Sequence, residues 1–167
     1  MNGTSSLPTF GKPVVPRYDG SFHSPAGNRT PMNQTSSPPQ PFNAATATAE
    51  EKAVAEPLEN YFRGHGNDDA AYMRRAFLPT AHVESMQDGE FTSWPLETYC
   101  ARFKGSPAAD ESTRRRTIDW IDVGGTSACA RITLLHGPKT FIDHFVLLKT
   151  AQGWRIANKS FCAMPSA

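Results

Sequence analysis

The chain has 167 residues, 38% of them apolar, which supports one hydrophobic core of ordinary size rather than two. Its net charge of +1 gives no long-range field of the kind that gathers nucleic acid or anionic membrane. No run of about 18 uncharged apolar residues occurs, and the first thirty residues lack the pattern of a signal peptide. We therefore expect a cytoplasmic protein with neither membrane nor nucleic-acid partners.

Several kinds of chemistry have no support in the sequence. The cysteines Cys100, Cys129 and Cys162 are odd in number, widely spaced and without a CxxC pair, so they favour neither a disulfide framework nor a zinc site. No Walker loop, GxSxG, HExxH or complete GxGxxG occurs, which argues against nucleotide hydrolysis, serine hydrolase and zinc protease activities. We expect no metal and no cofactor.

Residues 1–45 differ in composition from the rest of the chain. They hold eight of the fourteen prolines, many Ser, Thr, Asn and Gly residues, and only four charged side chains. Such a segment buries too little apolar area to offset the entropy of ordering it. It is predicted to be a disordered tail, followed by one domain over residues 46–167.

The first predicted element of the domain is an amphipathic helix. Thr48 and Glu51 have the spacing of a capping box, and apolar residues recur at helical spacing as far as Gly64. Pro57 removes one backbone hydrogen bond from such a helix. The helix therefore either kinks at Pro57 or begins near residue 56.

Three shorter elements are predicted next, and each is bounded by capping or turn residues. They are a helix capped by Asn67 or Asp68 and ending before Pro79, a strand over 81–86 with a turn over 87–90, and a helix from Ser93 and Pro95 to Gly105.

The C-terminal part of the domain is predicted to consist of four consecutive strands. They cover residues 117–123, 126–135, 139–150 and 153–162, and the last two form a hairpin around Ala151-Gln152-Gly153. Links this short cannot make a parallel crossover, so the ladder is expected to be antiparallel. Helices followed by a run of strands indicate an α+β fold, with the helices on one face of one sheet.

This order of elements, with the stretches FLPTAHVESMQDGEF, WPLETYCARF, IDWIDVGGTSACARITLL and FIDHFVLLKTAQGWRIANKSF, resembles the nuclear transport factor 2-like superfamily. Within it, the chain is most similar to small bacterial proteins called "putative lumazine-binding" or polyketide-cyclase-like. The resemblance implies a nuclear transport factor 2-like, or cystatin-like, fold: a cone-shaped curved antiparallel sheet packed against three N-terminal helices, with a pocket inside the cone.

Ketosteroid isomerases belong to the same superfamily, and Asp143 looks like their protonated aspartic acid, which donates a hydrogen bond to a developing oxyanion. Their general base lies in a VED stretch. Here Val83-Glu84-Ser85 has a serine at that place. A hydroxyl without an activating partner is a poor base at neutral pH. The resemblance therefore does not imply isomerase activity.

The strand over 139–150 contains the main candidate site residue. Alternation places Phe141, Asp143 and Phe145 on one face, and a pocket lined by that face suits a flat ligand held by a few hydrogen bonds. Alternatively, Asp143 pairs with Lys159 or Arg131 on a neighbouring strand. Both interpretations remain open at this point.

The other candidates are spread over the domain. His82, in the first strand, is a candidate base, and Lys159 is placed to neutralise an anionic substrate group or Asp143. Helical and strand periodicity explains most of the aromatic candidates as core residues. The basic run Arg114–Arg116 is interpreted as a solvated strand end or a partner contact. The candidate ligand-binding residues are Tyr61, Phe77, Trp94, Trp120, Phe141, Phe145 and Lys159.

Three functions are consistent with these patterns. The leading one is a homodimeric binding domain, pairing through the outer face of its sheet, for a small hydrophobic, aromatic or polyketide-like ligand. The second is a cofactor-independent lyase, isomerase or cyclase that uses Asp143 and His82. The third is a protein-interaction module whose tail binds partners.

Overall fold

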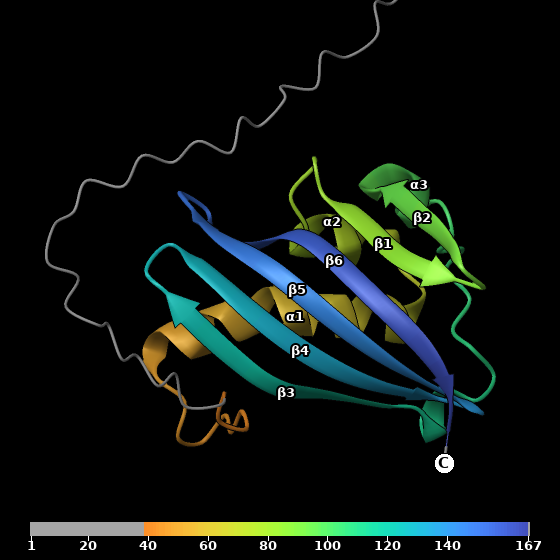
Figure 1. Ribbon diagram of the computed structural model, residues 1–167, viewed down its shortest axis with the longest axis horizontal. Coiled ribbons are helices and arrows are strands. Elements are labelled where there is room, and N and C mark those ends of the chain that lie inside the picture. Colours follow the sequence, from red (N-terminus) through yellow and green to blue (C-terminus); the bar gives the residue numbers. More distant parts are fainter. Residues whose placement is uncertain (1–38, 167) are drawn as a thin grey trace, which may run out of the picture. The chain divides into compact units, whose positions relative to one another are not determined.

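The computed structural model describes residues 39–166, so residues 1–38 of the predicted tail lie outside the described part. Figure 1 shows the domain, with the helices behind one curved sheet. The helices are α1 (Ala49–Asn67), α2 (Ala70–Ala76), α3 (Leu96–Cys100) and a short 3-10 turn (Glu111–Thr113). The strands are β1 (His82–Gln87), β2 (Glu90–Pro95), β3 (Arg115–Gly124), β4 (Ser127–His136), β5 (Lys139–Thr150) and β6 (Gly153–Pro165).

Helix α1 begins where the capping box predicts. The hydroxyl of Thr48 accepts a hydrogen bond from the backbone N–H of Glu51, and the Glu51 carboxylate accepts one from the N–H of Thr48. These bonds satisfy donors that a helix start leaves free. The helix then continues through Pro57 and is 19 residues long. Of the two alternatives for this helix, the start near residue 56 is therefore wrong.

The junction of α1 and α2 differs from the prediction by one residue. Asp69, and neither Asn67 nor Asp68, caps α2 by accepting a hydrogen bond from the N–H of Ala71 at 2.7 Å. Asp68 instead ends α1 with a left-handed backbone, at φ 52°. Its carboxylate accepts hydrogen bonds from the N–H groups of Lys104 and Ser106, so it holds the loop that follows α3.

Strand β2 is absent from the prediction, which began a helix at Ser93. Asp88 and Gly89 both have positive φ, at 51° and 84°, as a two-residue hairpin turn requires. The turn returns the chain alongside β1, where Trp94 pairs with Val83. Helix α3 is consequently confined to Leu96–Cys100.

The six strands form one sheet in the order β2-β1-β6-β5-β4-β3. The four C-terminal strands are antiparallel, as predicted, whereas β1 lies parallel to β6, with Val83 beside Lys159. The sheet is therefore mixed and not antiparallel throughout. Irregularities in register interrupt the pairing of β3 with β4 and of β5 with β6, and such bulges increase the bend and twist of a sheet. The resulting curved sheet under three helices matches the nuclear transport factor 2-like fold.

The core lies between the helices and the concave face of the sheet. Alternate residues of β5 are buried, among them Asp143, Phe145 and Leu147. Their strand neighbours, such as His144 and Val146, are exposed on the opposite face, which we call the outer face. This alternation confirms the two faces of β5 expected from the sequence.

The described part of the chain begins before the predicted domain boundary. The backbone N–H of Phe42 donates to the carbonyl of Asp119 at 2.9 Å, and Pro41 forms a bridge with Trp120. The edge of β3 is thus in contact with a segment that the sequence assigned to the tail. Across residues 39–166, no helix combines the length and apolar character that crossing a membrane requires.

Candidate functional site

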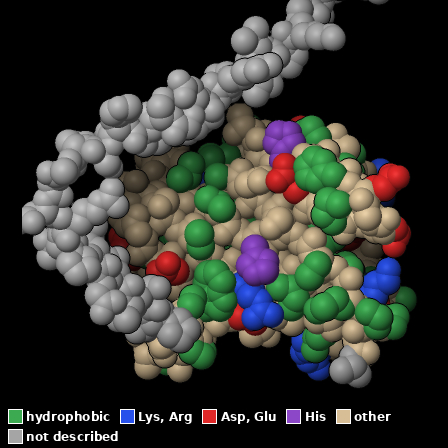
Figure 2. All heavy atoms as spheres, in the orientation of Figure 1, with side chains coloured by type: hydrophobic (Ala, Val, Ile, Leu, Met, Phe, Trp, Pro, Cys, Tyr) green, Lys and Arg blue, Asp and Glu red, His purple; other side chains and the backbone are tan. Residues whose placement is uncertain are grey.

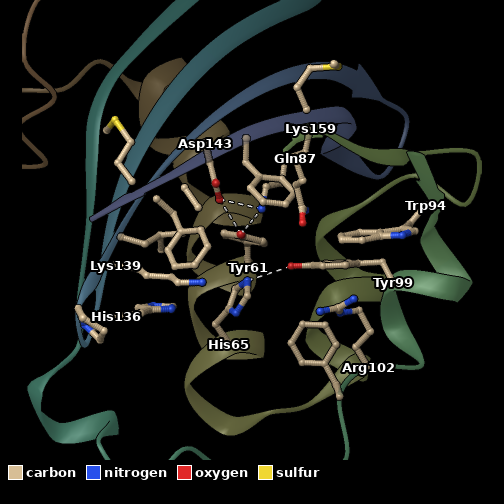
Figure 3. A pocket seen from close by; sticks show the side chains of 18 of the residues that line it. Tyr61, His65, Gln87, Trp94, Tyr99, Arg102, His136, Lys139, Asp143 and Lys159 are labelled. Atoms are coloured by element: carbon tan, nitrogen blue, oxygen red, sulfur yellow. Dashed lines mark hydrogen bonds and ion pairs between the residues drawn. The ribbon is translucent and has the colours of Figure 1, made fainter. Parts of the chain in front are cut away.

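A cavity of about 830 Å³ opens at one end of the concave face, where the carboxyl end of α1 meets the ends of β5 and β6. Figure 3 shows it from close by. Its walls carry six aromatic rings from five different parts of the chain: Tyr61, Trp94, Tyr99, Phe103, Phe141 and Phe161. Aromatic walls with a small number of polar groups are typical of sites for flat small molecules.

Three polar side chains meet at the closed end of the cavity, and we call them the buried triad: Tyr61 of α1, Asp143 of β5 and Lys159 of β6. The hydroxyl of Tyr61 donates to Asp143 Oδ2 at 2.6 Å, and Lys159 Nζ donates to the Tyr61 oxygen at 2.6 Å. Lys159 Nζ also lies 2.8 Å from Asp143 Oδ2. All three residues line the cavity.

The fold brings the triad together through strand register and helix periodicity. Phe145 pairs with Lys159 and Asp143 pairs with Phe161 across β5 and β6, so all four side chains lie on the concave face. Lys159 is therefore the diagonal neighbour of Asp143. Tyr61 reaches them from the buried face of α1, above Phe145, with ring centroids 5.2 Å apart.

Burial determines the electrostatics of the triad. It raises the pKa of the Tyr61 phenol well above its ordinary value of 10.0, and the negative charge of Asp143 raises this pKa further, so the phenol keeps its proton. Burial also lowers the pKa of Lys159, whereas Asp143 acts in the opposite direction. The ammonium lies 4.8 Å from the ring centroids of both Tyr61 and Phe161, a geometry that stabilises a cation.

Asp143 is fully buried and its two oxygens differ. Oδ2 accepts hydrogen bonds from Tyr61 and Lys159, whereas Oδ1 has no partner among residues 39–166. In this arrangement Asp143 accepts hydrogen bonds through Oδ2, whereas the resemblance to ketosteroid isomerases implies an acid that donates one.

A second polar group lies on the wall next to the triad. His65 is one helical turn after Tyr61, and its Nε2 lies 3.0 Å from the hydroxyl of Tyr99. Burial lowers the pKa of His65 well below 6.5, so its ring is neutral near pH 7. The pKa of His136, whose ring centroid is 5.9 Å from that of His65, is lowered to about 4 by burial and then by Arg116.

The structure brings five of the predicted site residues to the cavity: Tyr61, Trp94, Phe141, Asp143 and Lys159. Phe77 and Phe145 are buried in the core behind Tyr61 and are absent from the cavity wall. Trp120 is half-buried and pairs with Arg131 on the outer face, near the exposed His144.

His82 does not lie at the cavity. It is exposed, its ring contacts the carbonyl of Thr80, and its neighbour Val83 is the residue that faces the core. An acid–base pair of Asp143 and His82 is therefore not assembled around one ligand. Ser85 is on the buried side of β1, but its hydroxyl bonds Thr92 and it is absent from the cavity wall.

The partner of Asp143 was left open between two basic residues, and the structure identifies Lys159. Arg131 pairs instead with Asp119, with 3.3 Å between the charged atoms. The basic run before β3 is also held locally: Arg114 pairs with Asp110 and Arg116 with Glu111. Within the described residues, no three or more His, Cys, Asp and Glu side chains gather to form a metal site.

Sequence reasoning missed several residues of the wall. His65 was not among the candidates from the sequence, although it follows Leu58 and Tyr61 at i+7 and i+4 on one helix face, which was a usable signal. Phe103 follows Leu96 and Tyr99 at the same i+7 and i+4 spacing, whereas Arg102 and Phe161 carried no comparable signal. All three residues reach the cavity wall through the placement of α3 and the end of β6 in space.

The comparisons with known proteins agree with this architecture. Residues 49–162 match the model of a family described as "Putative lumazine-binding". A nuclear transport factor 2-like protein of unknown function from Shewanella baltica OS155 has a TM-score of 0.64 and 28% identity, over 72% of this chain and 99% of that one. No curated protein matches the chain.

Two further solved structures of unknown function show the same fold at lower identity. The one from Silicibacter pomeroyi DSS-3 has a TM-score of 0.62 and 21% identity, over 71% of this chain and 100% of that chain. The one from Methylobacillus flagellatus KT has a TM-score of 0.61 and 23% identity, over 71% and 96% of the two chains. Because the family model spans most of the domain, the chain belongs to the family described as "Putative lumazine-binding", within the nuclear transport factor 2-like superfamily.

Proposed function

We propose that the domain binds a flat aromatic small molecule in the cavity at the ends of β5 and β6. The observation that carries the proposal is an aromatic cavity of about 830 Å³ with a buried triad at its closed end. Pockets for small molecules have volumes of roughly 300–1,000 Å³ and combine apolar walls with a few convergent polar groups.

The walls suit a planar ring. Trp94 and Phe161 lie with ring centroids 6.3 Å apart, and Phe161 lies 6.4 Å from Phe141. The guanidinium of Arg102 lies over the Trp94 ring, 4.7 Å from its centroid, and both side chains line the cavity. A ligand stacked on these groups gains dispersion and burial energy with little loss of side-chain freedom.

The triad supplies the polar end of the site. An ammonium group has three N–H donors, and Lys159 uses two of them, toward Tyr61 and Asp143. The third is free to bond a ring oxygen of a ligand. The family description names lumazine, a pteridine with two ring carbonyl groups, and such a molecule has the shape and the acceptors that this site favours.

We also propose that two copies of the domain pair through the outer face of the sheet. Three large apolar side chains are exposed there. Their exposed fractions are 42% for Leu135, 46% for Val146 and 41% for Leu148. Figure 2 shows hydrophobic side chains distributed over this face. Light scattering should give the mass of a dimer for the wild type and of a monomer for Val146→Glu/Leu148→Lys, and a monomeric wild type would contradict this part of the proposal.

The test of ligand binding is a thermal-shift screen of pterins, flavins and aromatic acids. A ligand of the native state raises the melting temperature, and at about 100 times its Kd it adds roughly 2.7 kcal/mol to the free energy of unfolding. Ala163→Trp adds bulk inside the cavity and should abolish the shift. Cys162→Trp is the matched control, because the adjacent Cys162 is exposed and absent from the cavity wall. If no compound of any ring class produces a shift, the proposal fails.

A further inference from the structure

The unpartnered oxygen of Asp143 gives information about the ligand. Oδ1 is a buried acceptor on a fully buried residue that lines the cavity, and none of the described residues donates to it. Native proteins leave few buried polar atoms without a partner, because each costs about 1–3 kcal/mol. The donor for Oδ1 is therefore to be sought among molecules that enter the cavity.

The neighbouring group has the opposite need. Lys159 Nζ retains one N–H after its bonds to Tyr61 and Asp143, and the side chain is 5% exposed. Nζ lies 2.8 Å from Oδ2 of the same carboxylate, so the free donor and the free acceptor lie close enough for one molecular edge to reach both. The closed end of the cavity thus offers one acceptor beside one donor.

We propose that this acceptor and donor recognise a cyclic amide or imide edge, an N–H group next to a C=O group in a planar ring. The ligand N–H donates to Asp143 Oδ1, and the ligand carbonyl accepts from Lys159 Nζ. The inference rests on the proposed function, and it narrows the ligand class from flat aromatic molecules to ring systems with a pyrimidinedione or lactam edge.

The surrounding rings fit this orientation. Phe161 follows Lys159 by two residues on the same face of β6, and its ring lies 4.8 Å from Nζ. A ring whose edge meets Lys159 and Asp143 extends from there toward Phe161 and Trp94. An acceptor-only edge, such as a carboxylate, would leave Oδ1 without a donor and would add a second negative charge beside Asp143.

The test uses the wild-type protein and matched ligands in calorimetric titrations. Lumazine carries N–H groups next to carbonyls, 1,3-dimethyllumazine replaces both N–H groups by N–CH₃, and 6,7-dimethyllumazine carries the same added bulk on the other ring. We expect 1,3-dimethyllumazine to bind roughly 10- to 100-fold more weakly than the other two, because it leaves Oδ1 unpaired. Uracil and lumiflavin, each with its N-methylated counterpart, extend the comparison to smaller and larger rings.

A double variant tests whether Asp143 and Lys159 recognise the amide edge of the ligand. Asp143→Leu/Lys159→Met replaces the buried ion pair by apolar groups of similar size, an exchange that proteins often tolerate without loss of stability. It should bind lumazine and 1,3-dimethyllumazine with affinities that differ less than about threefold, a difference under 1 kcal/mol. A double variant that keeps the wild-type preference would overturn the assignment of these two residues.

The outcomes separate the inference from the proposed function. Equal binding of all three lumazines by the wild type would mean that water satisfies Oδ1, and the inference would fail while aromatic binding stands. Binding only by rings without an N–H beside a carbonyl, such as 2-naphthoate, would also overturn it. If no ring of either kind binds at millimolar concentration, the proposed function itself fails.

Discussion

The concave face of the sheet has two halves with the same pattern of inward-facing residues and opposite environments. In the packed half, Phe145, Leu147 and Ile156 lie under the helices and are at most 2% exposed. In the open half, Phe141 and Phe161 occupy equivalent alternate positions on the same two strands but line a cavity. Strand alternation therefore determines which face of the sheet a side chain occupies, whereas the helices determine whether that face is packed in the core or lines a cavity.

The buried triad lies at the boundary between the two halves. The Tyr61 ring packs on Phe145 of the packed half, and Tyr61 also lines the cavity of the open half. Asp143 separates Phe145 from Phe141 on β5. The polar cluster thus marks the place where packing ends and, in our account, ligand contact begins.

The largest expected effect distinguishes the halves by stability. Phe145→Ala should lower the free energy of unfolding by about 3–5 kcal/mol, as for other fully buried Phe residues. Phe141→Ala, on the same strand and face, should cost on the order of 1 kcal/mol, because its ring is already partly exposed to the cavity. Chemical denaturation measures both, and equal losses would contradict the division into a packed and an open half.

The triad should behave as a buried ion pair. Asp143→Ala leaves the ammonium of Lys159 buried without its counter-charge and should lower the free energy of unfolding by about 3–5 kcal/mol. Arg131→Met is the control: it removes the more exposed Arg131–Asp119 pair on the outer face and should cost less than about 1 kcal/mol. A small loss for Asp143→Ala would mean that water already reaches the pair.

A smaller effect is expected in the pH dependence of stability. Burial holds the pKa of His65 well below 6.5, so the unfolded chain binds a proton more readily than the folded one as the pH falls below that value. The free energy of unfolding should therefore decrease from about pH 7 to about pH 5, above the range where most carboxylates titrate.

The share of His65 in this slope can be identified by substitution. His65→Phe should reduce the slope without abolishing it, because burial also lowers the pKa of His136, to about 4, and that histidine keeps its own contribution. Thermal unfolding at a series of pH values measures the slope. If His65→Phe kept the wild-type slope, the neutral state of His65 in the cavity wall would be contradicted.

Much of the fold could be predicted from the sequence because its signals are local. The capping box of α1, the short polar turns between the last four strands and the alternation along β5 each determine structure within a few residues. The turn at Asp88-Gly89 was an equally local signal. Had it been used in full, it would have predicted β2 in place of an early helix start at Ser93.

The candidate site was predictable only in part, because it depends on contacts between distant segments. The residue spacing predicted that Asp143 shares a face with Phe141 and Phe145, but whether Lys159 or Arg131 reaches it depends on strand register. The placement of His82 failed for a related reason. The strand was recognised, but not which of its two faces meets the core, since Val83 takes the buried position. The role of residues 1–38, the cytoplasmic location and the dimer stay predictions.

The most direct measurement is tryptophan fluorescence during a titration with lumazine. Trp94 lies in the cavity wall and Trp120 on the outer face, so the two residues report on different sides of the sheet. We predict saturable quenching in the wild type, which is retained in Trp120→Phe and lost or strongly reduced in Trp94→Phe. Quenching that disappears in Trp120→Phe but persists in Trp94→Phe would place the ligand outside the cavity and contradict the account.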